Sequence, residues 1–103
     1  MKTQQDFNKE FNRLYGNLKE LFRRIHDQEN NYPKRICANW FVNTLAEIMQ
    51  NPEVKVYLTH EQVNSIAFMA LNLVKTEFLN EEDKETLQSL LQNLKNAENN
   101  ITV

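Results

Sequence analysis

Glycine, proline and cysteine are scarce in this sequence. Glycine occurs once, at Gly16, proline twice, at Pro33 and Pro52, and cysteine once, at Cys37. So few chain breakers argue against a fold with many tight β-turns and favour long helices with short connections. A lone cysteine cannot form an internal disulfide, which favours a reducing compartment and predicts a cytoplasmic protein.

Long hydrophobic runs are missing as well. No apolar stretch approaches the ~18 residues that a membrane span needs, and residues 1–11 lack the apolar segment of a signal peptide. Mean hydropathy is −0.67, yet 41% of the 103 residues are hydrophobic, so the chain can bury a core. The sequence therefore predicts one domain that spans residues 1–103.

Residues suited to catalysis and metal binding are few. Neither His26 nor His60 has a second histidine or a cysteine at the spacing of zinc ligands on a helix. A single glycine is too few for a phosphate-binding loop. Cys37 falls on the core side of its helix, and the acidic residues of 81–85 suit the start of a helix. We therefore expect no enzymatic activity, no metal site and no cofactor.

Four segments have the periodicity of amphipathic helices. The first begins at a cap on Thr3, and its apolar stripe comprises Phe7, Phe11, Leu14, Leu18, Leu21 and Ile25, with Tyr15 and Phe22 at its edge. The second begins near Pro33 and stops before residues 50–52. A capping box of Thr59 and Gln62 opens the third, which we expect to end near Phe78.

Asn80 caps the fourth helix, whose stripe comprises Leu87, Leu90, Leu91 and Leu94. Residues 52–58 read as a short helix or an extended connector. Together these features predict an all-α fold, a small antiparallel helical bundle of four main helices, although other topologies of the same helices stay open.

The second helix carries no charge from Ile36 to Ala46, although it contains the only tryptophan. Projection at 100° per residue gives a core face of Cys37, Ala38, Phe41, Val42, Leu45, Ile48 and Met49. Ile36 and Trp40 fall outside this face, among Asn39, Asn43 and Glu47. Either a flanking element covers Trp40, or Ile36, Trp40 and the two asparagines form a partner contact, because interface centres are enriched in tryptophan and depleted of charge.

The third helix is uncharged from Gln62 to Val74. Its predicted core face comprises Val63, Ile66, Ala67, Ala70, Leu71, Val74 and Phe78. Met69 and Leu73 widen one edge, and Phe68 lies beyond the other. A helix that is apolar nearly all round is either central in its fold or docked on another chain, so a second interface, including a homodimer through Phe68 and Met69, is one hypothesis.

Four cations flank the first connection. Arg23 and Arg24 end the first helix, with Arg24 also placed to pair with Glu20, and Lys34 and Arg35 begin the second. Residues 1–35 carry eight Lys/Arg against five Asp/Glu, whereas residues 36–103 carry four against nine. The cluster is a solvated corner, a site for an acidic protein, or a site for nucleic-acid phosphates, which the acidic net charge of −2 disfavours.

In length and helical pattern the chain resembles two classes of small non-enzymatic protein. One is the phage-encoded inhibitors of host defence, such as anti-CRISPR proteins, and the other is the bacteriocin immunity proteins. No motif assigns the chain to either class.

The leading hypothesis is an inhibitor or adaptor that binds a protein partner through Ile36, Trp40, Asn39, Asn43 and Phe68, with Arg23, Arg24, Lys34 and Arg35 attracting an acidic surface. An immunity-like protein and a nucleic-acid-binding regulator are the alternatives. No membrane association is expected.

Overall fold

The computed structural model describes residues 4–27, 31–51 and 58–98. Within these ranges the chain forms four helices, α1 (Gln4–Asp27), α2 (Asn31–Gln50), α4 (His60–Val74) and α5 (Glu81–Glu98), and no strand. The prediction of an all-α bundle is therefore confirmed. Thr3, the side chain of Phe7, and all of the predicted 52–58 element except Leu58 lie outside the described part. None of the four helices is both long and apolar enough to cross a membrane.

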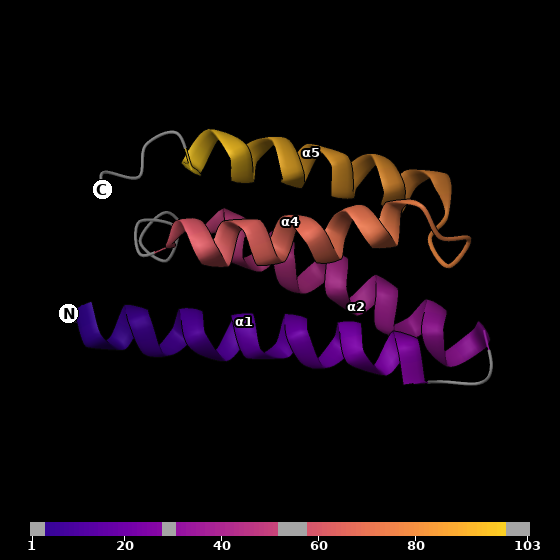
Figure 1. Ribbon diagram of the computed structural model, residues 1–103, viewed down its shortest axis with the longest axis horizontal. Helices are drawn as coiled ribbons and strands as arrows, with labels where there is room; N and C mark the ends of the chain where they lie inside the picture. The colour runs from indigo at the N-terminus through magenta and orange to yellow at the C-terminus, as the bar shows by residue number, and fades with distance from the viewer. Residues whose placement is uncertain (1–3, 28–30, 52–57, 99–103) are drawn as a thin grey trace.

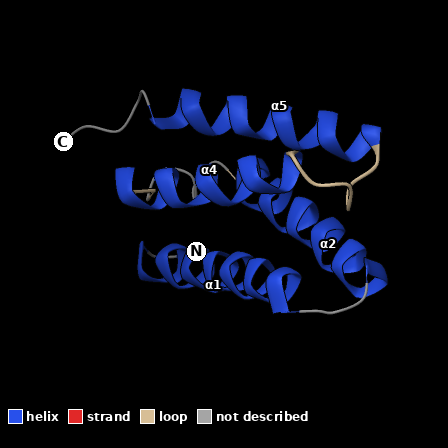
Figure 2. Ribbon diagram, turned by 45° about the vertical axis from the view of Figure 1, so that its right-hand side comes forward, coloured by secondary structure: helices blue, strands red, loops and turns tan. Residues whose placement is uncertain are grey.

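The helices alternate in direction along the bundle, as Figure 1 shows. In both overall views α4 lies between α1 and α5 (Figures 1 and 2), and in Figure 1 α2 passes behind α4. The closest helix pairs are α1 with α2, α4 with α5, and α2 with α5. His60 Nδ1 lies 3.7 Å from Glu98 Oε1, so the start of α4 meets the end of α5. The core is enclosed by all four helices.

Three of the four predicted apolar stripes are buried in this core as predicted. All the predicted stripe residues of α1 from Phe11 onward, of α2 and of α5 are buried. Tyr15 and Phe22 are half-buried and pack against the core at its edge. Burial of these side chains supplies the main driving force for folding.

The predicted core face of α4 is partly wrong. Leu71 is 46% exposed, whereas Met69 and Leu73 are buried with Val63, Ile66 and Ala70. The buried stripe is therefore rotated toward the edge that contains Met69 and Leu73. Because α4 has no charged residue between Gln62 and Val74, its pattern does not distinguish one neutral face from another. Packing against the rest of the bundle decides the rotation.

The boundaries of α4 and α5 follow local hydrogen bonds. The Thr59 hydroxyl accepts from the Gln62 backbone at 3.1 Å, and the Gln62 side chain accepts from the Thr59 backbone at 3.0 Å, which confirms the capping box. The predicted end at Phe78 is wrong, because α4 stops at Val74. Thr76 bonds to the Leu73 carbonyl through its hydroxyl at 2.7 Å, an alternative to continued helix.

The predicted N-cap of α5 is confirmed. The Asn80 side chain accepts a hydrogen bond from the Asp83 backbone at 2.7 Å. Glu81, Glu82 and Asp83 occupy the first turn, where the helix dipole favours negative charge.

Candidate functional site

Trp40 is a large exposed side chain on α2. Its exposed fraction is 52%, whereas its neighbour Phe41 is 0% exposed. Asn39 and Asn43 are exposed and Ile36 is half-buried. We call Ile36, Asn39, Trp40 and Asn43 the Trp40 surface. The flanking helices leave this surface open, as the partner-contact hypothesis requires.

The amide side chains of the Trp40 surface are held in place. Asn39 donates to the Asp83 carboxylate at 3.2 Å, across to the first turn of α5. Asn43 donates to the Asn39 side-chain oxygen at 3.3 Å. The Trp40 ring is therefore flanked by amides that already have defined positions, which lowers the entropy loss when a partner binds.

A second exposed apolar group lies on α4. Phe68 is 64% exposed and Leu71, three residues on and on the same side of the helix, is 46% exposed. The Phe22 ring of α1 meets the Phe68 ring edge-on, with 6.4 Å between centroids. We call Phe22, Phe68 and Leu71 the Phe68 strip. Sequence reasoning missed the part played by Phe22 and Leu71, although the absence of charge in α4 pointed to its helix.

The Trp40 surface and the Phe68 strip lie beside different helices. Asn39 of the Trp40 surface contacts Asp83 of α5, whereas Phe68 contacts Phe22 of α1. In Figure 1, α4 lies in front of α2. The two surfaces share no residue.

Met69 is only 4% exposed and packs inside the protein's own core. The predicted homodimer contact through Phe68 and Met69 is therefore reduced to Phe68 and its exposed neighbours.

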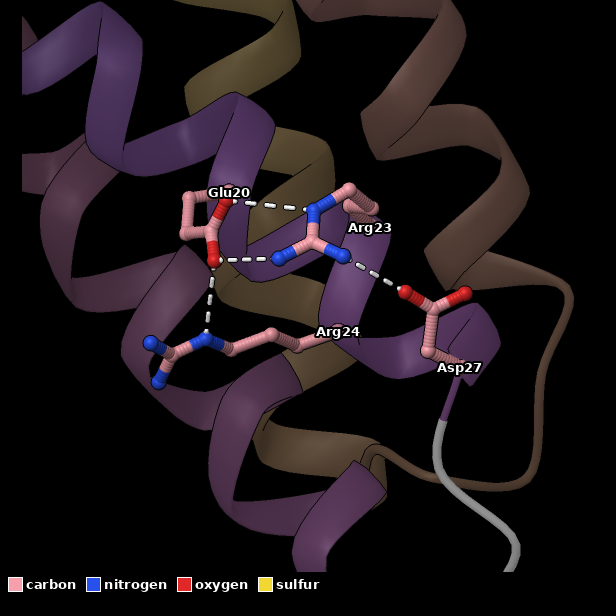
Figure 3. A network of polar contacts seen from close by, with 4 residues as sticks. All are labelled: Glu20, Arg23, Arg24 and Asp27. Atoms are coloured by element: carbon pink, nitrogen blue, oxygen red, sulfur yellow. Dashed lines mark hydrogen bonds and ion pairs between the residues drawn. The ribbon is translucent and has the colours of Figure 1, made fainter.

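The two arginines at the end of α1 already have carboxylate partners (Figure 3). Arg23 binds Glu20 through Nη2 at 2.7 Å and Asp27 through Nη1 at 2.7 Å. Arg24 Nε lies 3.1 Å from the same Glu20 oxygen, which confirms the predicted Arg24–Glu20 pair. Two cations and two anions balance, so this part of the predicted basic corner presents no net positive charge.

Lys34 has different surroundings from the two arginines. Its Nζ lies 5.2 Å from the centroid of the Phe78 ring, in the arrangement of a cation–π contact. It also lines a cavity of about 150 Å³ whose apolar walls are Phe22, Ile25, Leu73 and Phe78. We call this space the Lys34 cavity. Arg35, the fourth cation of the predicted corner, is exposed.

The Glu20 network has a pH dependence with a definite sign. Hydrogen bonds from Arg23 and then Arg24 lower the pKa of the Glu20 carboxyl below its usual value, and the contact with Glu20 raises the pKa of Arg23. Because folding favours the ionised carboxylate, its contribution to stability is full above the ordinary glutamate pKa. That contribution is lost as pH falls through the lowered pKa of the folded state.

We therefore expect Glu20→Gln to lower the thermal unfolding midpoint slightly at about pH 7, and by less at about pH 2, because protonation of the Glu20 carboxyl weakens its hydrogen bonds to the arginines. The control is Glu77→Gln, because Glu77 is exposed and makes no ion pair with the described residues. Thermal unfolding followed by circular dichroism measures both. A Glu20→Gln difference of the same size at both pH values would contradict this interpretation.

The remaining candidate groups are dispersed. Cys37 is a buried free thiol. His26 packs its ring edge-on against Phe22, and His60 lies beside Glu98. Among the described residues, no three His, Cys, Asp or Glu side chains form a group that could hold a metal ion.

Comparisons with protein families, with curated proteins and with solved structures return no match to this chain. Its function is therefore inferred from its own residues.

Proposed function

We propose that this protein acts by binding a protein partner, as an inhibitor or adaptor, and that the Trp40 surface makes the contact. The observation that carries the proposal is the 52% exposure of Trp40 in a stretch of α2, from Ile36 to Ala46, that contains no charged residue. Tryptophan is enriched among binding hot spots, and charged residues are depleted at interface centres. The proposal assigns no catalytic role to any residue.

Ile36 extends the apolar part of this surface by one turn of helix. It is half-buried, so a partner that covers Trp40 also contacts an apolar neighbour that is already positioned. Asn39 and Asn43 provide amide groups at the rim, and their mutual hydrogen bond leaves acceptor and donor capacity for a partner. This arrangement of an aromatic anchor with a polar rim, in which Asn39 is bonded to Asp83, suits recognition of a protein surface.

An inhibitor of host defence encoded by a phage is our leading example of such a protein, and a bacteriocin-immunity-like protein is the alternative. Both act by binding another protein, so both are consistent with the Trp40 surface. The Trp40 surface itself does not favour one partner over another.

Site-specific photocrosslinking tests the proposal. A benzophenone amino acid at position 40 should give an adduct heavier than the 12.3 kDa chain in the cells that make the protein. The same amino acid in place of Gln88, an exposed residue of α5, should not. Mass spectrometry identifies the adduct, and an adduct of two copies of this chain would instead favour the homodimer. Equal adducts from both positions, or none from position 40, would contradict the proposal.

The nucleic-acid hypothesis loses support from the Glu20 network, because Arg23 and Arg24 already bind carboxylates. It predicts an affinity that falls steeply with salt and disappears when Arg23, Arg24, Lys34 and Arg35 are neutralised. A complex that is insensitive to salt would count against it.

A further inference from the structure

We infer that the Lys34 cavity and the Phe68 strip together form a second binding site, which takes a short acidic and apolar segment of a protein. In this site one carboxylate enters the cavity beside Lys34, and the neighbouring apolar side chains lie across Phe22 and Phe68. This goes beyond the proposed function, because none of the residues of this site belongs to the Trp40 surface.

The cavity contains a cation without an anion. Its polar lining residues are His26, Lys34, Asn72 and Thr76, and no aspartate or glutamate is among the described residues that line it. Lys34 is half-buried and makes no ion pair with the described residues. A half-buried cation beside apolar walls gains more from a carboxylate than a fully exposed one does, because screening by water is weaker there.

The other polar groups of the cavity are already partly engaged. Asn72 donates to the Phe68 carbonyl at 2.8 Å, and the Thr76 hydroxyl donates to the Leu73 carbonyl at 2.7 Å. Lys34 and His26 are therefore the lining side chains left to donate to a ligand, and Lys34 carries the positive charge that selects an anion. The cavity volume of about 150 Å³ suits one acidic side chain and is smaller than the roughly 300–1,000 Å³ of pockets for drug-sized ligands.

The Phe68 strip adjoins the cavity. Phe22 lines the cavity and also meets the Phe68 ring. Asn72 lines the cavity one helical turn beyond Phe68, to which it is hydrogen-bonded. Leu71 extends the exposed apolar area along α4. A peptide with an acidic residue next to two apolar residues matches this arrangement, in which the Lys34 cavity is followed by the Phe68 strip.

A second cation lies beside the strip on α1. Lys19 Nζ lies 5.3 Å from the centroid of the Tyr15 ring and makes no ion pair within the described chain. Lys19 and Phe22 are three residues apart, so they are neighbours on the helix surface. The exposed residues of α4 between Gln62 and Val74 are uncharged. Two cations around an apolar strip favour an acidic apolar peptide, whereas a nucleic acid would need a longer basic row.

The test is an NMR titration of the ¹⁵N-labelled full chain with two synthetic probes, acetyl-Asp-Leu-Phe-amide and acetyl-Asn-Leu-Phe-amide. We expect the aspartate peptide to shift the backbone amide signals of Phe22, Lys34 and Asn72 and to bind about tenfold more tightly than the asparagine peptide. Equal affinities, or shifts confined to other parts of the chain, would overturn the inference. So would tighter binding of a short oligothymidylate at the same residues.

Matched variants separate the two parts of the site. Lys34→Gln should remove the preference for aspartate, and Lys95→Gln, an exposed lysine of α5, should keep it. Phe68→Ala should weaken both peptides alike, and because Phe68 is 64% exposed the variant should stay folded. Retained preference for aspartate in a folded Lys34→Gln variant overturns the role of Lys34.

Trp40→Ala should leave these titrations unchanged, so this site and the proposed function can fail independently.

Discussion

Replacement of Phe41 by alanine should destabilise the protein by about 3–5 kcal/mol. Phe41 is 0% exposed and belongs to the stripe of α2 that faces the core. Truncation removes most of an aromatic ring and leaves a cavity that the surrounding leucines fill only in part. The free energy of unfolding of a whole domain is about 5–15 kcal/mol, so the variant should lose a large share of its stability. Urea unfolding monitored by circular dichroism measures the difference.

The adjacent residue is the matched control for this experiment. Trp40→Ala should change the free energy of unfolding by less than about 1 kcal/mol, because half of the side chain is exposed and alanine has the higher helix propensity. Two large aromatic residues that are neighbours in sequence thus have opposite expected effects on stability. Equal losses from both substitutions would mean that Trp40 belongs to the core, and the Trp40 surface would have to be abandoned.

Trp40→Ala should weaken partner binding by about 30-fold or more, which corresponds to the roughly 2 kcal/mol that defines a binding hot spot. The tryptophan ring is the largest apolar group on the Trp40 surface, and its truncation removes contact area that no neighbour replaces. Isothermal titration calorimetry with the partner that the crosslinking experiment identifies measures the affinity. Gln88→Ala, on the exposed face of α5, serves as the control.

The same calorimetry can contradict the assignment. A folded Trp40→Ala variant that binds as tightly as the unchanged chain would remove the Trp40 surface from the interface. Loss of affinity in Gln88→Ala alone would move the interface to α5. The thermal midpoint of each variant shows whether the fold is intact.

Where charged residues alternate with apolar ones, the sequence is sufficient to predict the fold. The stripe of α1 from Phe11 to Ile25 is bounded by charged residues on its outer side, so only one rotation of the helix buries it without burying charge. The four leucines of α5 are bounded in the same way. For α2, the separation of Phe41 from Trp40 follows from the 100° rotation between successive residues.

The rotation of α4 could not be predicted in the same way. Leu71 and Leu73 are equally apolar, and neutral residues lie around both, so hydrophobic patterning does not choose between them. Packing within the bundle buries Leu73 and leaves Leu71 46% exposed. The end of α4 likewise depends on the hydrogen bond between Thr76 and Leu73, which leaves Phe78 free to meet Lys34.

The candidate site was only partly predictable for a related reason. Placement of Trp40 outside the core follows from helical geometry, but exposure depends on which helices pack beside α2. The four cations near the first connection look alike in sequence, yet Arg23 and Arg24 bind carboxylates and Lys34 lies over an aromatic ring. Long flexible side chains reach partners that helical periodicity does not specify.

The central claim is that Trp40 is accessible in the free protein, and its fluorescence tests this most directly because the chain has one tryptophan. The protein should be separated by size-exclusion chromatography, and the mass of its peak should be determined by light scattering. The emission maximum and acrylamide quenching should then be measured on the protein from that peak. We predict a mass near 12.3 kDa, red-shifted emission and efficient quenching. Blue-shifted emission that resists quenching would contradict the claim, and a mass near twice that of the chain would show that a second copy covers the residue.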